Sequence, residues 1–223
     1  MKDYERVIYG LAITAAIYFI AIFSTNWIRF SGGFTPGSFV THSVMLLLSI
    51  AAIVIFKKSV DFNISMPKLK NIIMPIIVGV AITFLSGILM SIITKMLGQE
   101  VEAHPSLLTM GPLQVFLFVF IYASIAEEFL FRGFLLNILK PLSKYKVSIF
   151  SIPVIISALT FGLGHLVLIS ADVSGLFIMR ILVFTTAMGL AAGYYQEKYK
   201  NISYAIVVHM AGNLFGLVST FLI

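Results

Sequence analysis

Three charged side chains lie within residues 112–139, an apolar run long enough to cross a bilayer. A charge inside a bilayer costs about 2.5–3.5 kcal/mol, so Glu127, Glu128 and Arg132 are candidate functional groups. Residues four apart share a helix face, whereas adjacent residues point about 100° apart. We therefore expect Glu128 to pair with Arg132, and Glu127 to be a free carboxylate directed elsewhere. A structural ion-pair lock between helices is the alternative.

Two later apolar runs carry the other polar candidates. His165 follows Phe161 by four residues, so the imidazole and the aromatic ring are expected on one helix face. His209 and Asn213 have the same spacing. Taken singly, each pair is typical of polar packing between membrane helices.

Together these side chains provide the groups needed to hydrolyse an amide with water. Glu127 and His165 could remove a proton from water. His209 and Asn213 could donate hydrogen bonds to the resulting oxyanion. In the alternative route, Glu127, His165 and His209 bind zinc and leave one position for water. The chain contains no cysteine, which excludes thiol chemistry, but the choice between no cofactor and zinc stays open.

The elements that must position these groups are membrane helices. Hydrophobic residues make up 60% of the 223-residue chain and charged residues only 11%, which excludes a water-soluble globule. The apolar runs are continuous and too long for barrel strands. We expect an all-α, polytopic transmembrane helix bundle with a polar catalytic cavity inside the bilayer. About seven spans are predicted, with eight as the alternative count, at 7–25, 38–56, 72–94, 112–139, 147–169, 175–196 and 202–223.

Basic residues between the spans predict the orientation. Eleven fall on one side of the membrane: Lys2, Arg6, Lys57, Lys58, Lys68, Lys70, Lys140, Lys144, Lys146, Lys198 and Lys200. Only Arg29 and Lys95 fall on the other side. The excess places the amino terminus in the cytoplasm and the carboxyl terminus outside a multi-pass cell-membrane protein. These scattered clusters are topology signals, so we expect no nucleic-acid partner.

The depth of His165 requires a break in the fifth span. Counted from Val147, His165 lies 18 residues along the run, too near the outer face to meet Glu127. Pro153 could mark the true start of the helix, which would place His165 12 residues deep. The sequence therefore predicts a membrane helix that begins near Pro153.

These motifs, in this order on successive hydrophobic segments, resemble the CPBP family of CAAX-protease and bacteriocin-processing intramembrane proteases, also called the ABI or type II CAAX prenyl endopeptidase-like family. The resemblance covers roughly residues 112–217. It implies that Glu127 and His165 activate water and that His209 and Asn213 stabilise the oxyanion. It also implies supporting roles for three further residues, Glu128, Arg132 and Phe161. We predict a single membrane domain, 1–223, with amino-terminal spans in 1–111 and a catalytic core in 112–217.

The resemblance implies an endopeptidase, either a metalloprotease or a glutamate-type protease, that acts on membrane-associated, prenylated or bacteriocin-like peptides. Its expected partners are membrane lipids and such a peptide or protein, and the short loops look prokaryotic. The sequence does not predict an oligomeric state. A noncatalytic bacteriocin self-immunity protein and a proton-coupled transporter are the alternative functions.

Four residues outside these motifs have simpler interpretations. His104, before Pro105, is interpreted as a solvated surface histidine, and His42 lies where span two begins, near the outer interface. Arg180 is expected to snorkel or to pair with a carboxylate. Gly189 belongs to a G-x-x-x-G pattern with Gly193 and is expected to pack against a neighbouring helix.

Overall fold

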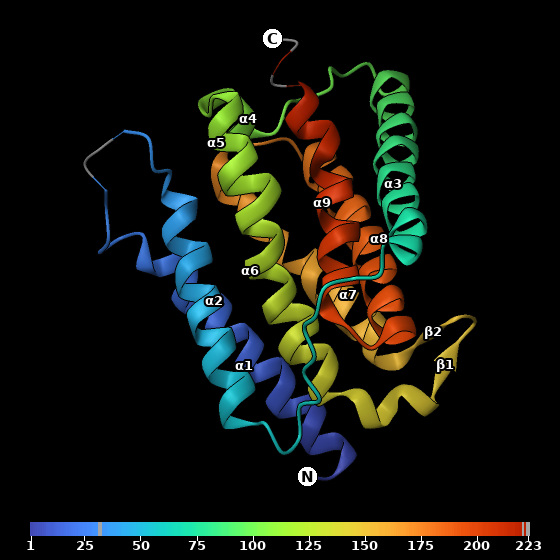
Figure 1. Cartoon of the computed structure of the whole chain (residues 1–223). Helices are drawn as coiled ribbons and strands as arrows, with labels where there is room; N and C mark the ends of the chain where they lie inside the picture. The colour runs from blue at the N-terminus through green and yellow to red at the C-terminus, as the bar shows by residue number, and fades with distance from the viewer. Residues whose placement is uncertain (31–32, 220, 222–223) are drawn as a thin grey trace.

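The chain folds into the predicted all-α polytopic bundle (Figure 1). This computed structural model describes residues 1–30, 33–219 and 221. Within these residues, six helices are long and apolar enough to cross a membrane, and a seventh apolar helix is shorter. The last predicted span, 202–223, corresponds to α9, and its positions 220 and 222–223 lie outside the described residues.

The first half of the chain forms three long helices joined by extended loops. Their bounds are α1 Asp3–Ser24, α2 Gly37–Ile55 and α3 Leu69–Met96, followed by the short α4 Pro105–Thr109. The loop after α2 crosses one end of the bundle and is fixed there. Its Asn63 side chain donates to the carbonyl of Lys200, and Asp61 forms an ion pair with Lys140.

The second half contains a long composite helix, a small hairpin and three further helices. These elements are α5 Pro112–Gln114, η1 Val115–Ala123, α6 Ser124–Glu128, η2 Phe129–Leu136, η3 Lys140–Lys144, β1 Lys146–Val147, β2 Phe150–Ser151, α7 Ile152–Gly164, η4 His165–Ala171, α8 Gly175–Tyr199 and α9 Ile202–Ser219. In the antiparallel hairpin, Lys146 lies opposite Ser151, and Val147 opposite Phe150.

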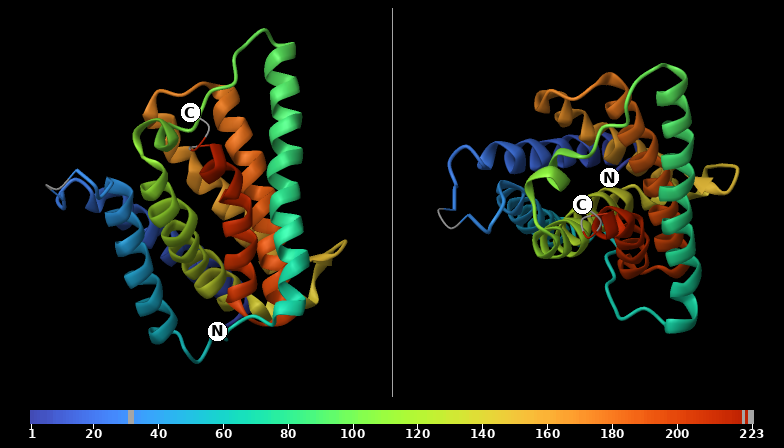
Figure 2. Two further views of the ribbon diagram at one scale, coloured as in Figure 1. Left: turned by 45° about the horizontal axis from the view of Figure 1, so that its top comes forward. Right: turned by 90° about the horizontal axis from the view of Figure 1, so that it is seen from above.

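The composite helix Pro112–Leu136 lies at the centre of the bundle. It contacts α1 and α2 on one side and α7, α8 and α9 on the other, while α3 packs along α8 and α9 (Figure 2). Its segments η1 and η2 are wound more widely than an α-helix, with i→i+5 hydrogen bonds. The predicted span 112–139 is therefore one rod with two widened segments, which apolar periodicity alone does not reveal.

The fifth membrane helix begins where Pro153 predicts. Ser151 caps α7 by accepting a hydrogen bond from the Val154 amide, and Pro153 lies in the first turn, where its missing N–H breaks no helical bond. Residues 146–151 form the hairpin instead, so the predicted start at 147 is wrong. His165 lies at the last turn of α7, where the chain tightens into the 3-10 segment η4.

Small residues bring α8 close to α7. A Cβ on Gly189 would lie 2.9 Å from the Ala158 Cα, and one on Gly193 would lie 3.0 Å from Val154 Cγ1. The G-x-x-x-G pattern therefore packs against a neighbouring helix of the same chain, as predicted.

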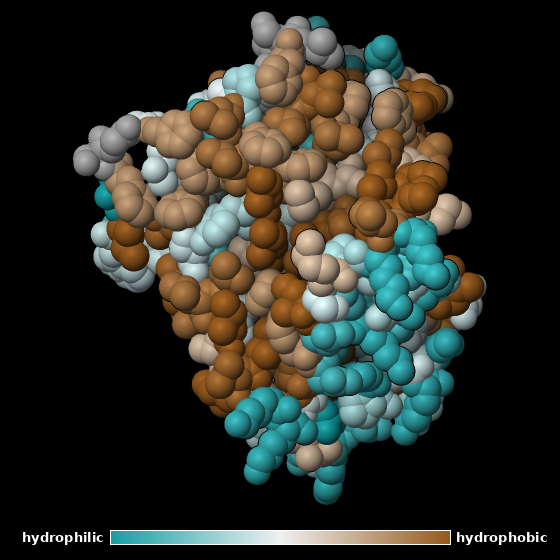
Figure 3. Space-filling view, in the orientation of Figure 1, coloured by the Kyte–Doolittle hydropathy of each residue, from teal (hydrophilic) through white to brown (hydrophobic). Residues whose placement is uncertain are grey.

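The outer surface matches a lipid environment. Large apolar side chains such as Leu47, Ile55 and Leu85 are exposed along the helices. Figure 3 shows this apolar surface over most of one face, and hydrophilic side chains concentrated toward the end that carries the amino terminus. A bilayer core requires that backbone N–H and C=O groups bond within the spanning segment and that apolar side chains point outward. These helices meet both requirements, so the protein is a multi-pass membrane protein.

Candidate active site

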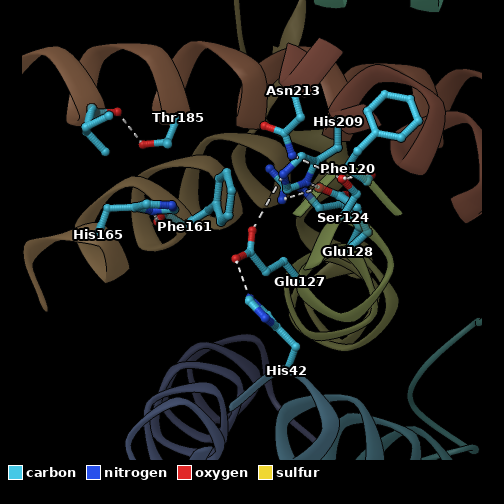
Figure 4. Close-up of polar contacts among 12 residues, drawn as sticks. His42, Phe120, Ser124, Glu127, Glu128, Phe161, His165, Thr185, His209 and Asn213 are labelled. Carbon is cyan, nitrogen blue, oxygen red and sulfur yellow. Dashed lines mark hydrogen bonds and ion pairs between the residues drawn. The ribbon is translucent and has the colours of Figure 1, made fainter. Parts of the chain in front are cut away.

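Glu127 lies between two histidines from different helices (Figure 4). Its Oε1 is 3.2 Å from His42 Nε2 on α2, and its Oε2 is 3.6 Å from His209 Nε2 on α9. A carboxylate only accepts hydrogen bonds, so His42 donates its Nε2–H. The second contact exceeds hydrogen-bond distance, which leaves Oε2 facing His209.

Glu128 points away from Glu127 and joins Arg132 to His209. Its Oε1 accepts a hydrogen bond of 3.0 Å from Arg132 Nη1 and one of 2.8 Å from His209 Nδ1. The predicted pairing of Glu128 with Arg132 is confirmed. Because Nδ1–H of His209 donates to this carboxylate, the ring is held with Nε2 toward Glu127.

α6 and α9 meet through two polar contacts one helical turn apart. Glu128 accepts from His209, and Asn213 Nδ2 donates to Ser124 Oγ over 3.2 Å. The four-residue spacing on each helix makes the two contacts coincide, with the helices antiparallel. His209 and Asn213 therefore do share the face that contacts the glutamate helix, as their spacing predicts.

His165 lies to one side of this cluster, next to Phe161. Its ring is 5.0 Å from the Phe161 ring, edge to face, and Nδ1–H donates to the Phe161 carbonyl over 3.0 Å. Nε2 of a neutral ring therefore carries the free lone pair. Phe161 in turn contacts His209, with ring centroids 5.5 Å apart, and Arg132 lies 4.7 Å over its face. The expected shared face of Phe161 and His165 is confirmed.

The sequence from this polar cluster through the flanking helices matches a known protease family. Residues 109–215, just under half of the chain, match the family model described as type II CAAX prenyl endopeptidase Rce1-like. This match supports the assignment of the chain to the CAAX-protease family that its motifs resemble. No curated protein and no solved structure matches the chain.

The matched region bears out the resemblance to CAAX proteases. It contains all seven residues singled out from the motifs, namely Glu127, Glu128, Arg132, Phe161, His165, His209 and Asn213. At family level the match supports a CAAX-type intramembrane endopeptidase. The individual roles of these residues stay predictions.

The proposed zinc ligands do not form a metal site in the described part of the chain. Within that part, no group of three or more His, Cys, Asp or Glu side chains is placed to hold one metal ion. The set Glu127, His165 and His209 does not fit zinc in this arrangement, so we derive no step through a metal.

His42 is the residue that the sequence interpretation undervalued. The sequence places His42 near the outer interface, yet its ring contacts Glu127, 85 residues away along the chain. The sequence does contain an indication of this role, because an ionisable residue within an apolar span is a candidate functional residue. The family match begins at residue 109 and does not include His42.

The loop before α4 lies over the ends of α7 and α8, and it corrects a second interpretation. His104 is not a solvated surface histidine, because its ring packs on Phe177, 5.8 Å between centroids. Burial, with a further contribution from the nearby His165 ring, lowers the pKa of His104 to about 4. Arg180 donates to the backbone carbonyl of Glu102 in the same loop, not to a carboxylate.

Proposed function

We propose that this protein is an intramembrane endopeptidase in which Glu127 and His165 activate a water molecule against a peptide carbonyl. The single observation that supports this proposal is the position of Glu127. Its carboxylate is held between histidines of α2 and α9 and retains 17% side-chain exposure, whereas its neighbour Glu128 retains 1%. Glu127 is therefore the carboxylate that water and substrate can approach.

We assign proton transfer to the two acceptor atoms that make no hydrogen bond to the described residues, Oε2 of Glu127 and Nε2 of His165. Glu127 Oε2 accepts the proton as the water oxygen attacks the carbonyl carbon, because Oε1 already accepts from His42. Nε2 of His165 provides a second acceptor, because Nδ1 is committed to Phe161. The products of the attack are a tetrahedral intermediate and a protonated carboxyl group.

Asn213 and His209 are assigned to the oxyanion. The Asn213 amide has two N–H groups, and one donates to Ser124, which leaves the second for the substrate oxygen. His209 Nε2 donates only when it carries a proton, since Nδ1–H donates to Glu128. A protonated His209 could then pass that proton to the leaving amine nitrogen.

The substrate is inferred to be a peptide anchored at the membrane. The reacting groups lie within membrane helices, and the matching family model is a CAAX prenyl endopeptidase. A peptide whose cysteine carries a prenyl chain would bring its carboxyl-terminal segment to that depth. We take a prenylated CAAX peptide as the first probe and the same peptide without the lipid as the second.

Cleavage of these two quenched fluorescent peptides by the purified protein in liposomes tests the proposal. Glu127→Gln is expected to reduce kcat by about 10²- to 10⁴-fold, the usual contribution of a general base. Glu100→Gln makes the same chemical change on an exposed loop and should leave cleavage unchanged. Full activity of Glu127→Gln, or no cleavage of either peptide by the wild type, would overturn the proposal, and the latter would favour a noncatalytic protein.

A further inference from the structure

We propose that His42 of α2 is a positioning residue of this active site: it donates Nε2–H to Glu127 Oε1 and so directs Oε2 toward His209. The inference rests on the proposed function. It assigns a role to a residue outside the region that matches the family model, on a helix the catalytic motifs do not include.

The first argument is the geometry at Glu127. The rotation of a carboxylate about its last bond is broad, so its oxygens are not fixed by rotamer preference alone. The bond to His42 Nε2, at 3.2 Å, occupies Oε1 and leaves Oε2 facing His209 Nε2 at 3.6 Å. Both partners are mostly shielded, with side-chain exposures of 13% for His42 and 17% for Glu127.

The second argument is the way the helices hold His42 in place. Ser43, the next residue of α2, hydrogen-bonds to the Tyr122 hydroxyl over 2.9 Å. The Phe39 ring also contacts the Tyr122 ring, with centroids 5.1 Å apart. Tyr122 and Glu127 belong to consecutive segments, η1 and α6, of the same composite helix. Adjacent residues of α2 thus contact this helix at both Tyr122 and Glu127.

The third argument is the other ring nitrogen of His42. Nδ1 is buried and has no hydrogen-bond partner among the described residues. A histidine retained only to stabilise the packing would be expected to satisfy both nitrogens, because a buried unpaired polar atom costs about 1–3 kcal/mol. Among the described residues, the one side-chain hydrogen bond of His42 is to Glu127, the carboxylate assigned to water activation.

A pair of amide substitutions separates positioning from packing. The Gln amide nitrogen can take the place of histidine Nε2, whereas the Asn amide nitrogen takes the place of Nδ1 and stops short of Glu127. We expect His42→Asn to lower kcat by about 10- to 100-fold, the size of effect that a small misplacement of a reacting group produces. KM should stay within about twofold, and His42→Gln should recover most of kcat.

Ser49→Ala is the matched control on α2, since it removes a hydrogen bond within that helix, to the Met45 carbonyl, without touching Glu127. It should leave kcat within about twofold, and thermal unfolding in detergent checks that all variants fold. Equal kcat for the Asn and Gln variants, or a loss in Ser49→Ala equal to that in His42→Asn, would overturn the positioning role. An active Glu127→Gln would instead overturn the proposed function.

Discussion

Unlike Glu127, which is assigned to water activation, Arg132 supports the site indirectly. Its side chain is fully buried, donates to Glu128 and lies over Phe161, so it acts on the site through these two neighbours. Nε and Nη2 of Arg132 are buried without a hydrogen-bond partner in the described part of the chain. The guanidinium therefore depends strongly on the one carboxylate it contacts.

Removal of that cation should leave an uncompensated buried charge. Arg132→Met is expected to lower the free energy of unfolding by about 3–5 kcal/mol, because Glu128 then lacks its partner. The double variant Glu128→Gln/Arg132→Met removes both charges and should unfold at a higher temperature than the single variant. Thermal unfolding of the detergent-solubilised proteins measures both, and a double variant less stable than the single one would contradict this account.

Whether peptide cleavage needs a metal ion depends on whether Glu127, His165 and His209 can bind zinc together. Since the candidate zinc ligands are not assembled as a metal site in the described part, a chelator should leave peptide cleavage unchanged. The measurement is the rate after treatment with 1,10-phenanthroline, with thermal unfolding followed in parallel. Loss of cleavage that zinc restores would favour the metalloprotease route.

Sequence spacing predicted contacts within a helix but not contacts between helices. The pairing of Glu128 with Arg132 followed from a separation of one turn, and so did the shared face of His209 and Asn213. The partner of Glu127 could not be read in this way, because His42 is 85 positions distant and only the packing of α2 brings it near.

At the level of elements, the antiparallel contact of α6 with α9 sets the direction of the Asn213 amide. Ser124→Ala removes the acceptor for one Asn213 N–H, so the amide is free to turn away from the substrate oxygen. We expect kcat to fall, by less than the 10²- to 10³-fold that loss of an oxyanion donor costs. Ser49→Ala, which removes a bond within α2 only, is the matched control, and a Ser124→Ala enzyme with unchanged kcat would contradict the assignment.

The close approach of α7 and α8 depends on the absence of a side chain at Gly189. A Cβ there would lie 2.8 Å from Arg132 Nη2 and 2.9 Å from the Ala158 Cα, so backbone would have to move. Gly189→Ala should lower the free energy of unfolding by about 1–3 kcal/mol. Gly87→Ala, where an added Cβ has no described atom within 4 Å, should not destabilise the protein. Equal melting temperatures for the two variants would contradict this packing.

Element boundaries were predictable where a local signal marks them. Pro153 correctly located the start of α7 because its ring is favoured in a first helical turn. The widened winding of η1 and η2 was not predictable, because the apolar run shows no feature that separates i→i+5 from i→i+4 bonding.

At the scale of the whole molecule, the orientation in the bilayer remains a prediction from basic residues. The chain lacks cysteine, so single-cysteine variants can report it cleanly. Lys144 and Glu100 are both exposed and lie on opposite predicted sides. An impermeant maleimide should label Glu100→Cys in intact cells and label Lys144→Cys only after the membrane is opened. The reverse pattern would overturn the predicted orientation.

The loop of residues 97–104 should loosen at acidic pH. The depressed pKa of His104, about 4 against 6.5, means that the released loop binds more protons than the packed loop between these values. Packing is therefore at full strength above pH 6.5 and weakens as the pH falls toward 4. Amide exchange of 97–104, corrected for its intrinsic rate, should be faster at pH 5 than at pH 7. His104→Gln should remove this difference, and its persistence would contradict the assignment.

The contact between His42 and Glu127 joins a portion of the chain that matches the protease family to a portion that lies outside the match. The portion shared with the family ends, on its amino-terminal side, at residue 109. A truncated protein reduced to that portion would keep every group assigned to bond cleavage, yet its general base would be unrestrained on one side. Supplying the missing helices as a separate polypeptide should then restore turnover without adding a single reacting atom.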